Sequence, residues 1–172
     1  MRIINGQQIL SILSALFLLM PGAVMANKTI KADFVLVSKS ERTMYLMNQG
    51  RIIKRYPISL GENPVGHKRQ LNDKRTPEGR YTLDWRNPES KYHKSIHISY
   101  PSREDMARAR HNGVNPGGSI MIHGVVNDTV SEIMSELNKR PDWTDGCIAV
   151  TNKEMDEIWL AVKNGTPIEI LP

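Results

Sequence analysis

Short apolar segments with high β-sheet propensity recur along most of this chain. They lie at residues 32–38, 43–47, 51–60, 80–85, 95–99, 119–122, 148–150 and 167–171. Segments of this length, bounded by Gly, Pro or Asn, are typical of β-strands. Helical patterns are fewer, so the sequence predicts a β-rich α+β domain with a few helices packed on its strands.

Three capping motifs mark the expected helix starts. Ser102 is a predicted N-cap for a helix that runs through Arg110. Thr129 and Thr151 each begin a Thr-x-x-Glu capping box, and helix-spaced apolar residues follow both of them. We expect the helix after Thr151 to end at Asn164-Gly165, because Asn and Gly commonly terminate helices.

The first 26 residues have the order of a secretory signal peptide. Arg2 is followed by an uncharged apolar run at 9–20 and by a small-residue exit at Ala26. The run is shorter than the ~20 residues of a membrane-spanning helix. We therefore expect cleavage after Ala26, one domain at residues 27–172, no membrane span after cleavage, and a secreted protein.

The formal charge is +5 at pH 7. A mild basic excess suits an anionic setting such as a cell wall. There is no run of Lys and Arg, so we do not expect nucleic acid as a partner.

Cys147 is the only cysteine. Exported domains normally use cysteines in disulfide pairs, and a single one cannot pair within its own chain. By count alone, Cys147 is a buried inert thiol, an intermolecular link or a reactive group.

The residues around Cys147 favour the reactive interpretation. Gly146 permits a tight turn, and polar residues precede it, whereas an inert core thiol would be flanked by apolar residues on both sides. Only the thiolate attacks, so a base is needed. His123 ends the apolar segment 119–122 and could be that base, although a histidine at this position is by itself more often a core or edge residue.

Several motifs resemble the L,D-transpeptidase catalytic domain family, also called YkuD, over roughly Ile30 to Leu171. The motifs are Ile122-His123-Gly124, Thr144-Asp145-Gly146-Cys147-Ile148, Arg75-Thr76-Pro77-Glu78-Gly79-Arg80-Tyr81, the stretch Tyr92–Pro101, and Pro116-Gly117-Gly118. The resemblance implies a YkuD-like β-sandwich with packed helices.

The resemblance also implies a mechanism without a metal or organic cofactor. Cys147 would be the nucleophile and His123 the general acid and base, forming a thiolate–imidazolium pair. Backbone N–H groups around Gly146 and Cys147 would stabilise the oxyanion. The substrate would be a peptidoglycan stem peptide, cleaved before a terminal D-alanine. The acyl group would then pass to an amine and form a cell-wall cross-link. The resemblance therefore implies that residues 27–172 form a catalytic domain and that the protein is periplasmic and associated with the cell wall.

The chain departs from the common family motif at two positions. That motif reads Ser-His-Gly-Cys with an Arg two residues after the Cys, whereas this chain has Asp145 before the Gly and Ala149 in place of the Arg. The backbone carbonyl of Asp145 could still orient His123. An Arg would bind a substrate carboxylate, so either another cation (Arg86, Lys94 or Arg103) replaces it or the substrate differs.

The resemblance places further residues along the substrate groove. They are Tyr92, His93, His97, Gly124, Thr144 and Arg86. His93 and His97 lie four residues apart on an expected strand, roughly 13 Å, which is too far for two ligands of one zinc ion. His67 and His111 are expected at the surface.

Three other functions remain open. The same Cys147–His123 pair could use water and act as a carboxypeptidase or endopeptidase on stem peptides or wall-linked protein. The domain could be a binding module that has lost catalysis. It could also be an unrelated secreted β domain with a slow, structural thiol.

Overall fold

The computed structural model describes residues 31–127 and 142–172. The described strands are β1 (Phe34–Ser38), β2 (Thr43–Asn48), β3 (Arg51–Pro57), β4 (Gly79–Ser90), β5 (His93–Ile98), β6 (Met121–His123), β7 (Ile148–Ala149) and β8 (Thr166–Leu171). The described helices are α1 (Arg103–His111) and α3 (Asn152–Ala161). The predicted signal peptide and the helix expected after Thr129 lie outside the described residues.

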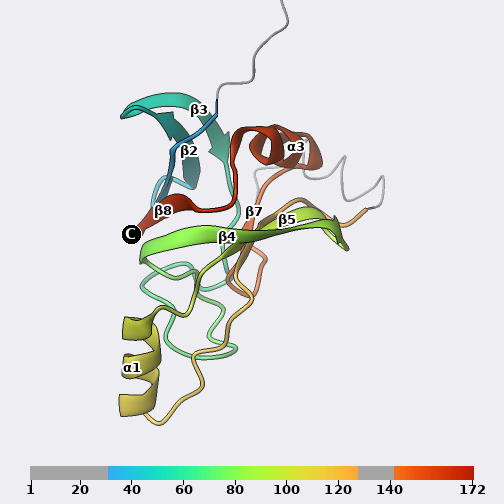
Figure 1. Cartoon of the computed structure of the whole chain (residues 1–172). Coiled ribbons are helices and arrows are strands. Elements are labelled where there is room, and N and C mark those ends of the chain that lie inside the picture. Colours follow the sequence, from blue (N-terminus) through green and yellow to red (C-terminus); the bar gives the residue numbers. More distant parts are fainter. Residues whose placement is uncertain (1–30, 128–141) are drawn as a thin grey trace, which may run out of the picture.

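All eight described strands belong to one curled sheet, in the order β3-β2-β1-β8-β4-β5-β6-β7 (Figure 1). The curl brings the two ends of the sheet together. Ser59, just after β3, exchanges two backbone hydrogen bonds of 2.9 Å with Ala149 of β7. The sheet therefore almost closes on itself, and its last two strands are held from both sides.

The core lies where the alternating apolar side chains of the strands meet α3. Val35 in β1 and Leu46 in β2 are fully buried, and so are Met155 and Ile158 on one face of α3. Helix α3 packs against β5, on the opposite side of β4 and β5 from α1 (Figure 1). Neither described helix has the length and apolar character needed to cross a membrane.

The β-rich prediction with packed helices is confirmed, and both described helices start where their caps predicted. Ser102 and Thr151 each accept a hydrogen bond from the backbone N–H three residues on, in complete capping boxes. Some ends differ from the prediction; β3, for example, ends at Pro57 rather than at residue 60. Helix α3 ends at Ala161 rather than at Asn164-Gly165, and β4 continues to Ser90, well past residue 85.

Candidate active site

Two neighbouring parallel strands bring His123 and Cys147 to the same face of the sheet. Ile122 pairs with Ile148 and His123 with Ala149. Side chains alternate along a strand, and Ile122 and Ile148 both point into the core, with no exposed surface. His123 directly follows Ile122 and Cys147 directly precedes Ile148. Both side chains therefore project from the face of the sheet opposite to the core.

His123 is held in one orientation. Its Nδ1 lies 2.6 Å from the carbonyl oxygen of Gly124. A carbonyl can only accept, so Nδ1 carries the proton and Nε2 of the neutral ring is a proton acceptor. The carbonyl that orients His123 is thus that of Gly124 and not that of Asp145, because the imidazole ring turns toward the residue that follows β6.

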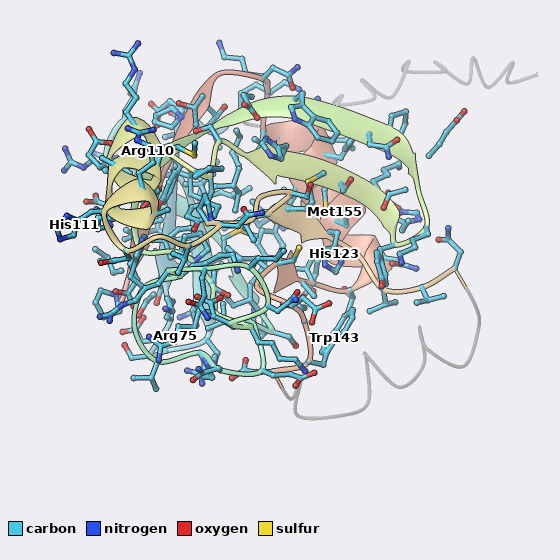
Figure 2. All side chains as sticks on the ribbon, turned by 90° about the horizontal axis from the view of Figure 1, so that it is seen from below. Arg75, Arg110, His111, His123, Trp143 and Met155 are labelled. Carbon is cyan, nitrogen blue, oxygen red and sulfur yellow. The ribbon has the colours of Figure 1, made fainter. Side chains whose placement is uncertain are left out.

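Aromatic rings enclose His123. The Tyr92 ring lies 4.7 Å from it and the Trp143 ring 5.7 Å away, in an edge-on arrangement. Figure 2 shows His123 and Trp143 as neighbours. His123 is only 4% exposed. This burial lowers the pKa of the imidazole, and nearby Lys91 lowers it further, against the raising effect of the Gly124 carbonyl.

The Cys147 thiol lies among backbone groups. Its Sγ is 3.4 Å from the N–H of Met121 and 3.7 Å from the carbonyl of Ser119. Burial raises the pKa of the thiol, the Met121 N–H opposes this, and the Asp145 carboxylate raises the pKa further. Within the described residues, no hydrogen bond joins Cys147 to His123, although both line one pocket.

A tight turn presents Cys147. The Thr144 hydroxyl donates to the Cys147 carbonyl at 2.8 Å and accepts from the Gly146 N–H at 3.1 Å. Gly146 has φ +127°, and a Cβ there would lie 2.6 Å from the carbonyl oxygen of Arg75. Only glycine fits this close backbone approach, which explains the Gly-Cys sequence.

The same turn decides which N–H groups remain for an oxyanion. The Gly146 N–H is engaged by the Thr144 hydroxyl, so it is not the free donor that the sequence suggested. In the described part of the chain, the Cys147 N–H has no hydrogen-bond acceptor.

One pocket of about 470 Å³ contains both candidate catalytic residues. It is lined by Lys68, Leu71, Asn72, Lys91, Tyr92, Gly118, Ser119, Ile120, His123, Trp143, Thr144, Asp145 and Cys147. Tyr92 and Thr144, which the sequence predicted as substrate-groove residues, both line this pocket. Gly124 lies behind the pocket, where a Cβ would meet the Asn152 side chain at 2.3 Å.

The three cations considered from the sequence do not line this pocket. Arg86 stacks on the Trp159 ring at 3.6 Å. Lys94 pairs with Asp156 of α3 at 2.5 Å. Arg103 begins α1 and is exposed. Arg86 pairs with the core residue Ile96 of β5, and Lys94 lies two residues before Ile96, so both point to the α3 side of the sheet.

The cations that do line the pocket are Lys68 and Lys91. Lys68 is buried and bonds Asp73 at 2.8 Å. Lys91 is exposed, with its ammonium 4.9 Å from the centre of the Tyr92 ring. Lys91 directly precedes the Tyr92–Pro101 motif, and that adjacency was the one signal in the sequence that could have identified it.

The remaining histidines have partners of their own. His93 contacts Asp156 at 2.7 Å, on the α3 side, and does not line the pocket. His97 contacts Asp84 at 2.7 Å, outside the pocket. His67, expected at the surface, is half-buried and lies 2.9 Å from the buried carboxylate of Asp105. His111 is exposed, as predicted.

A second pocket of about 550 Å³ lies between the 67–79 loop and α1. Its charged groups largely neutralise one another. Asp105 is contacted by His67, Arg108 and the hydroxyl of Tyr81, and Glu78 pairs with Lys39. This pocket is therefore part of the structural support of the loop.

Comparison with known proteins shows the family of the chain. Residues 32–170 match the L,D-transpeptidase catalytic domain family, YkuD. Escherichia coli K12 "Putative L,D-transpeptidase YafK" is 32% identical over 133 residues, 73% of this chain and 45% of YafK.

Solved structures share the fold. The helical cell shape determining protein Pgp2 of Campylobacter jejuni gives a TM-score of 0.59 at 23% identity, over 80% of this chain and 46% of Pgp2. Bd1075 of Bdellovibrio bacteriovorus gives 0.55 at 24% identity, over 85% and 50%. The chain spans about half the length of these relatives. It belongs to the L,D-transpeptidase catalytic domain family.

Proposed function

We propose that this protein is a cysteine-dependent peptidoglycan L,D-transpeptidase, with Cys147 as nucleophile and His123 as general acid and base. The observation that carries the proposal is the position of His123 at the end of β6 and of Cys147 directly before the adjacent β7, with both lining one pocket. The neutral His123 ring presents an accepting Nε2, because Nδ1 donates to Gly124. The family acts on cell-wall peptides, which fits an exported protein.

The first half-reaction acylates the enzyme. His123 Nε2 takes the Cys147 proton as the sulfur attacks the peptide carbonyl, forming a C–S bond. The Cys147 N–H is the proposed donor to the resulting oxyanion. The C–N bond then breaks, the imidazolium protonates the departing amine, and a thioester remains.

The second half-reaction transfers the acyl group. An amine of another stem peptide attacks the thioester and gives its proton to His123. The C–S bond breaks, and the Cys147 thiolate recovers the proton from the imidazolium. Water in place of the amine would give hydrolysis, so the choice of acceptor decides between transferase and hydrolase.

Lys91 is the proposed anchor for the substrate carboxylate. The group that exchanges a proton with His123 must lie beside His123. Lys91 lines the same pocket, with its ammonium 4.9 Å from the centre of the Tyr92 ring, and the Tyr92 ring lies 4.7 Å from the His123 ring. A carboxylate next to the reacting nitrogen would therefore meet the Lys91 ammonium. Lys91 would replace the arginine that the family motif has where this chain has Ala149.

Purified muropeptides test the proposal. The full chain is incubated with disaccharide-tetrapeptides, and the products are separated by mass. We expect cross-linked dimers and released D-alanine, both lost in Cys147→Ala. Trimmed monomers without dimers would assign the hydrolase alternative, and unchanged turnover by Cys147→Ala would refute the thiol mechanism.

A further inference from the structure

Four side chains form a row across the sheet on the same face as the catalytic pair. His97 of β5 pairs with Met121 of β6. Ile122 and Ile148 are paired; Met121 directly precedes the first and Cys147 the second, so Met121 and Cys147 occupy neighbouring positions. The Met121 N–H contacts the Cys147 sulfur at 3.4 Å. The row continues to Trp85 of β4, which contacts His97.

A β-bulge creates the outer end of this row. The pairs Leu83–Ile98 and Arg86–Ile96 flank the irregularity, so two residues of β4 oppose His97 alone. Those two residues are Asp84 and Trp85. Bulges redirect side chains, often beside functional sites, and this one directs both residues to His97.

Trp85 and His97 form a stacked pair, or platform, whose solvent-accessible surface comes mainly from Trp85. Their rings stack at 4.9 Å with an interplanar angle of 17°. Trp85 remains 46% exposed although it is a large apolar side chain. Asp84 lies 2.7 Å from His97 Nδ1. A carboxylate accepts, so Nδ1 donates and fixes the ring, while Nε2 has no hydrogen-bond partner within the described residues.

We propose that Trp85 and His97 bind the sugar portion of the peptidoglycan substrate, an inference that rests on the function proposed above. An exposed aromatic face packs well on the apolar C–H face of a pyranose ring. The free Nε2 of His97 and the Asp84 carboxylate offer hydrogen bonds to sugar hydroxyls. This combination of flat apolar and fixed polar surface suits a saccharide.

The spacing also fits. Trp85 lies three strands from Cys147, roughly 14 Å at the usual strand separation. Three stem-peptide residues separate the sugar from the scissile carbonyl, which is about 10 Å of extended chain. The lactyl ether that joins peptide to sugar adds to this length. A stem peptide acylating Cys147 can therefore place its sugar on Trp85.

Direct binding to the full chain carrying Cys147→Ala tests the inference without turnover. Calorimetry would compare a disaccharide-tetrapeptide with the same tetrapeptide lacking sugar. We expect Trp85→Ala to weaken disaccharide-tetrapeptide binding about tenfold, equivalent to ~1.4 kcal/mol, and to leave free-tetrapeptide binding unchanged. Trp85→Phe should retain most of the affinity.

Leu160→Ala is the matched control, because Leu160 is also an exposed apolar residue (58%) and lies on α3. It should change neither affinity. If Trp85→Ala fails to fold, Trp85→Leu keeps apolar volume without the aromatic face and gives the same test. Equal loss for both ligands, or loss for neither, would overturn the saccharide site.

The two proposals can fail separately. Trp85-dependent disaccharide binding, together with no turnover of any muropeptide by the unmodified chain, would support the platform and refute the proposed reaction. Turnover of muropeptides that does not depend on sugar or on Trp85 would support the reaction and refute the platform.

Discussion

Cys147 and His123 lie in surroundings that oppose charge on either group. Burial raises the pKa of the thiol and lowers the pKa of the imidazole. A thiolate–imidazolium pair, as the family resemblance suggested, is therefore disfavoured before substrate arrives. We infer that the resting pair is uncharged and that the proton moves during attack, when the oxyanion and the departing amine compensate the charge.

The pH dependence of alkylation tests this resting state. Thiolate forms as pH rises through the thiol pKa, and that pKa is raised here. The rate of Cys147 alkylation by iodoacetamide should therefore keep increasing above pH 8.5, the ordinary range of a cysteine. A plateau between pH 5 and 7, lost in His123→Ala, would instead show a preformed ion pair.

Substitution of His123 should affect turnover strongly. His123→Ala removes the proton acceptor, and general acid–base catalysis typically contributes ~10²–10⁴-fold. We expect the turnover rate with muropeptides to fall by about that factor, measured by D-alanine release. His123→Ala turnover within about twofold of the unsubstituted chain would exclude His123 as the base.

Lys91 can be tested by changing the substrate instead of the fold. Lys91 is exposed, so Lys91→Met should fold normally. With a tetrapeptide that ends in a carboxylate, we expect kcat/KM to fall roughly tenfold, as for loss of one charge-assisted hydrogen bond. With the corresponding carboxamide, the variant and the unsubstituted chain should differ little.

Lys91→Arg keeps the positive charge and should restore most of the activity. An equal effect of Lys91→Met on the carboxylate and carboxamide substrates would contradict the carboxylate anchor.

At the scale of elements, the turn 142–147 and strand β6 make the site. Gly146 tests the turn, because a Cβ there would lie 2.6 Å from the Arg75 carbonyl oxygen. Gly146→Ala should destabilise the fold by more than about 2 kcal/mol in urea denaturation and abolish turnover.

Gly165→Ala is the matched control for this prediction. Gly165 also has positive φ (+88°), but a Cβ there would have no atom within 4 Å. Gly165→Ala should lower the free energy of unfolding by about 1 kcal/mol, from backbone strain alone. Equal stability losses for the two variants would show that the close approach to Arg75 has no energetic importance.

The sequence predicted the elements better than the partners of the site. Strand alternation and capping boxes are local, so β1 to β8 and both described helix starts follow from neighbouring residues. The His123–Gly124 bond depends on how the ring turns at a strand end, and Lys91 enters the pocket through the chain that follows β4. Both features depend on tertiary packing, which the local sequence pattern does not specify.

The bulge in β4 is another feature that the local sequence pattern does not predict. Arg86 seemed suited to a substrate carboxylate, but the register shift between Leu83 and Arg86 places it on the α3 side, over Trp159. The shift also brings Asp84 and Trp85 to His97. A strand pattern read from sequence does not specify which residue is the extra one.

For the whole molecule, the curl of the sheet joins distant parts of the chain at the site. Asp142 begins the 142–147 turn. Its carboxylate accepts hydrogen bonds from Arg42, with Nη2 to Oδ2 at 2.8 Å, and from the N–H of Leu60 at 2.9 Å. These bonds link the β1–β2 loop, which contains Arg42, and the segment after β3, which contains Leu60, to the turn. The pocket thus depends on closure of the entire sheet.

Asp142→Ala tests this dependence. It leaves Arg42 and the Leu60 N–H without their acceptor, so we expect a stability loss of about 2–3 kcal/mol together with reduced turnover. Lys54→Ala is the control, since its pair with Glu157 is largely exposed (58% and 41%) and should contribute below ~1 kcal/mol. Equal losses in urea denaturation would contradict the closure argument.

The proposed mechanism requires that Cys147 carries the acyl group. Intact-protein mass spectrometry of the full chain, quenched in acid during turnover of a disaccharide-tetrapeptide, measures this directly. We predict an added mass equal to the substrate minus D-alanine, located on the Cys147 peptide and absent from Cys147→Ala. Product formation by an enzyme that never carries this mass, or that carries it on another residue, would contradict the account.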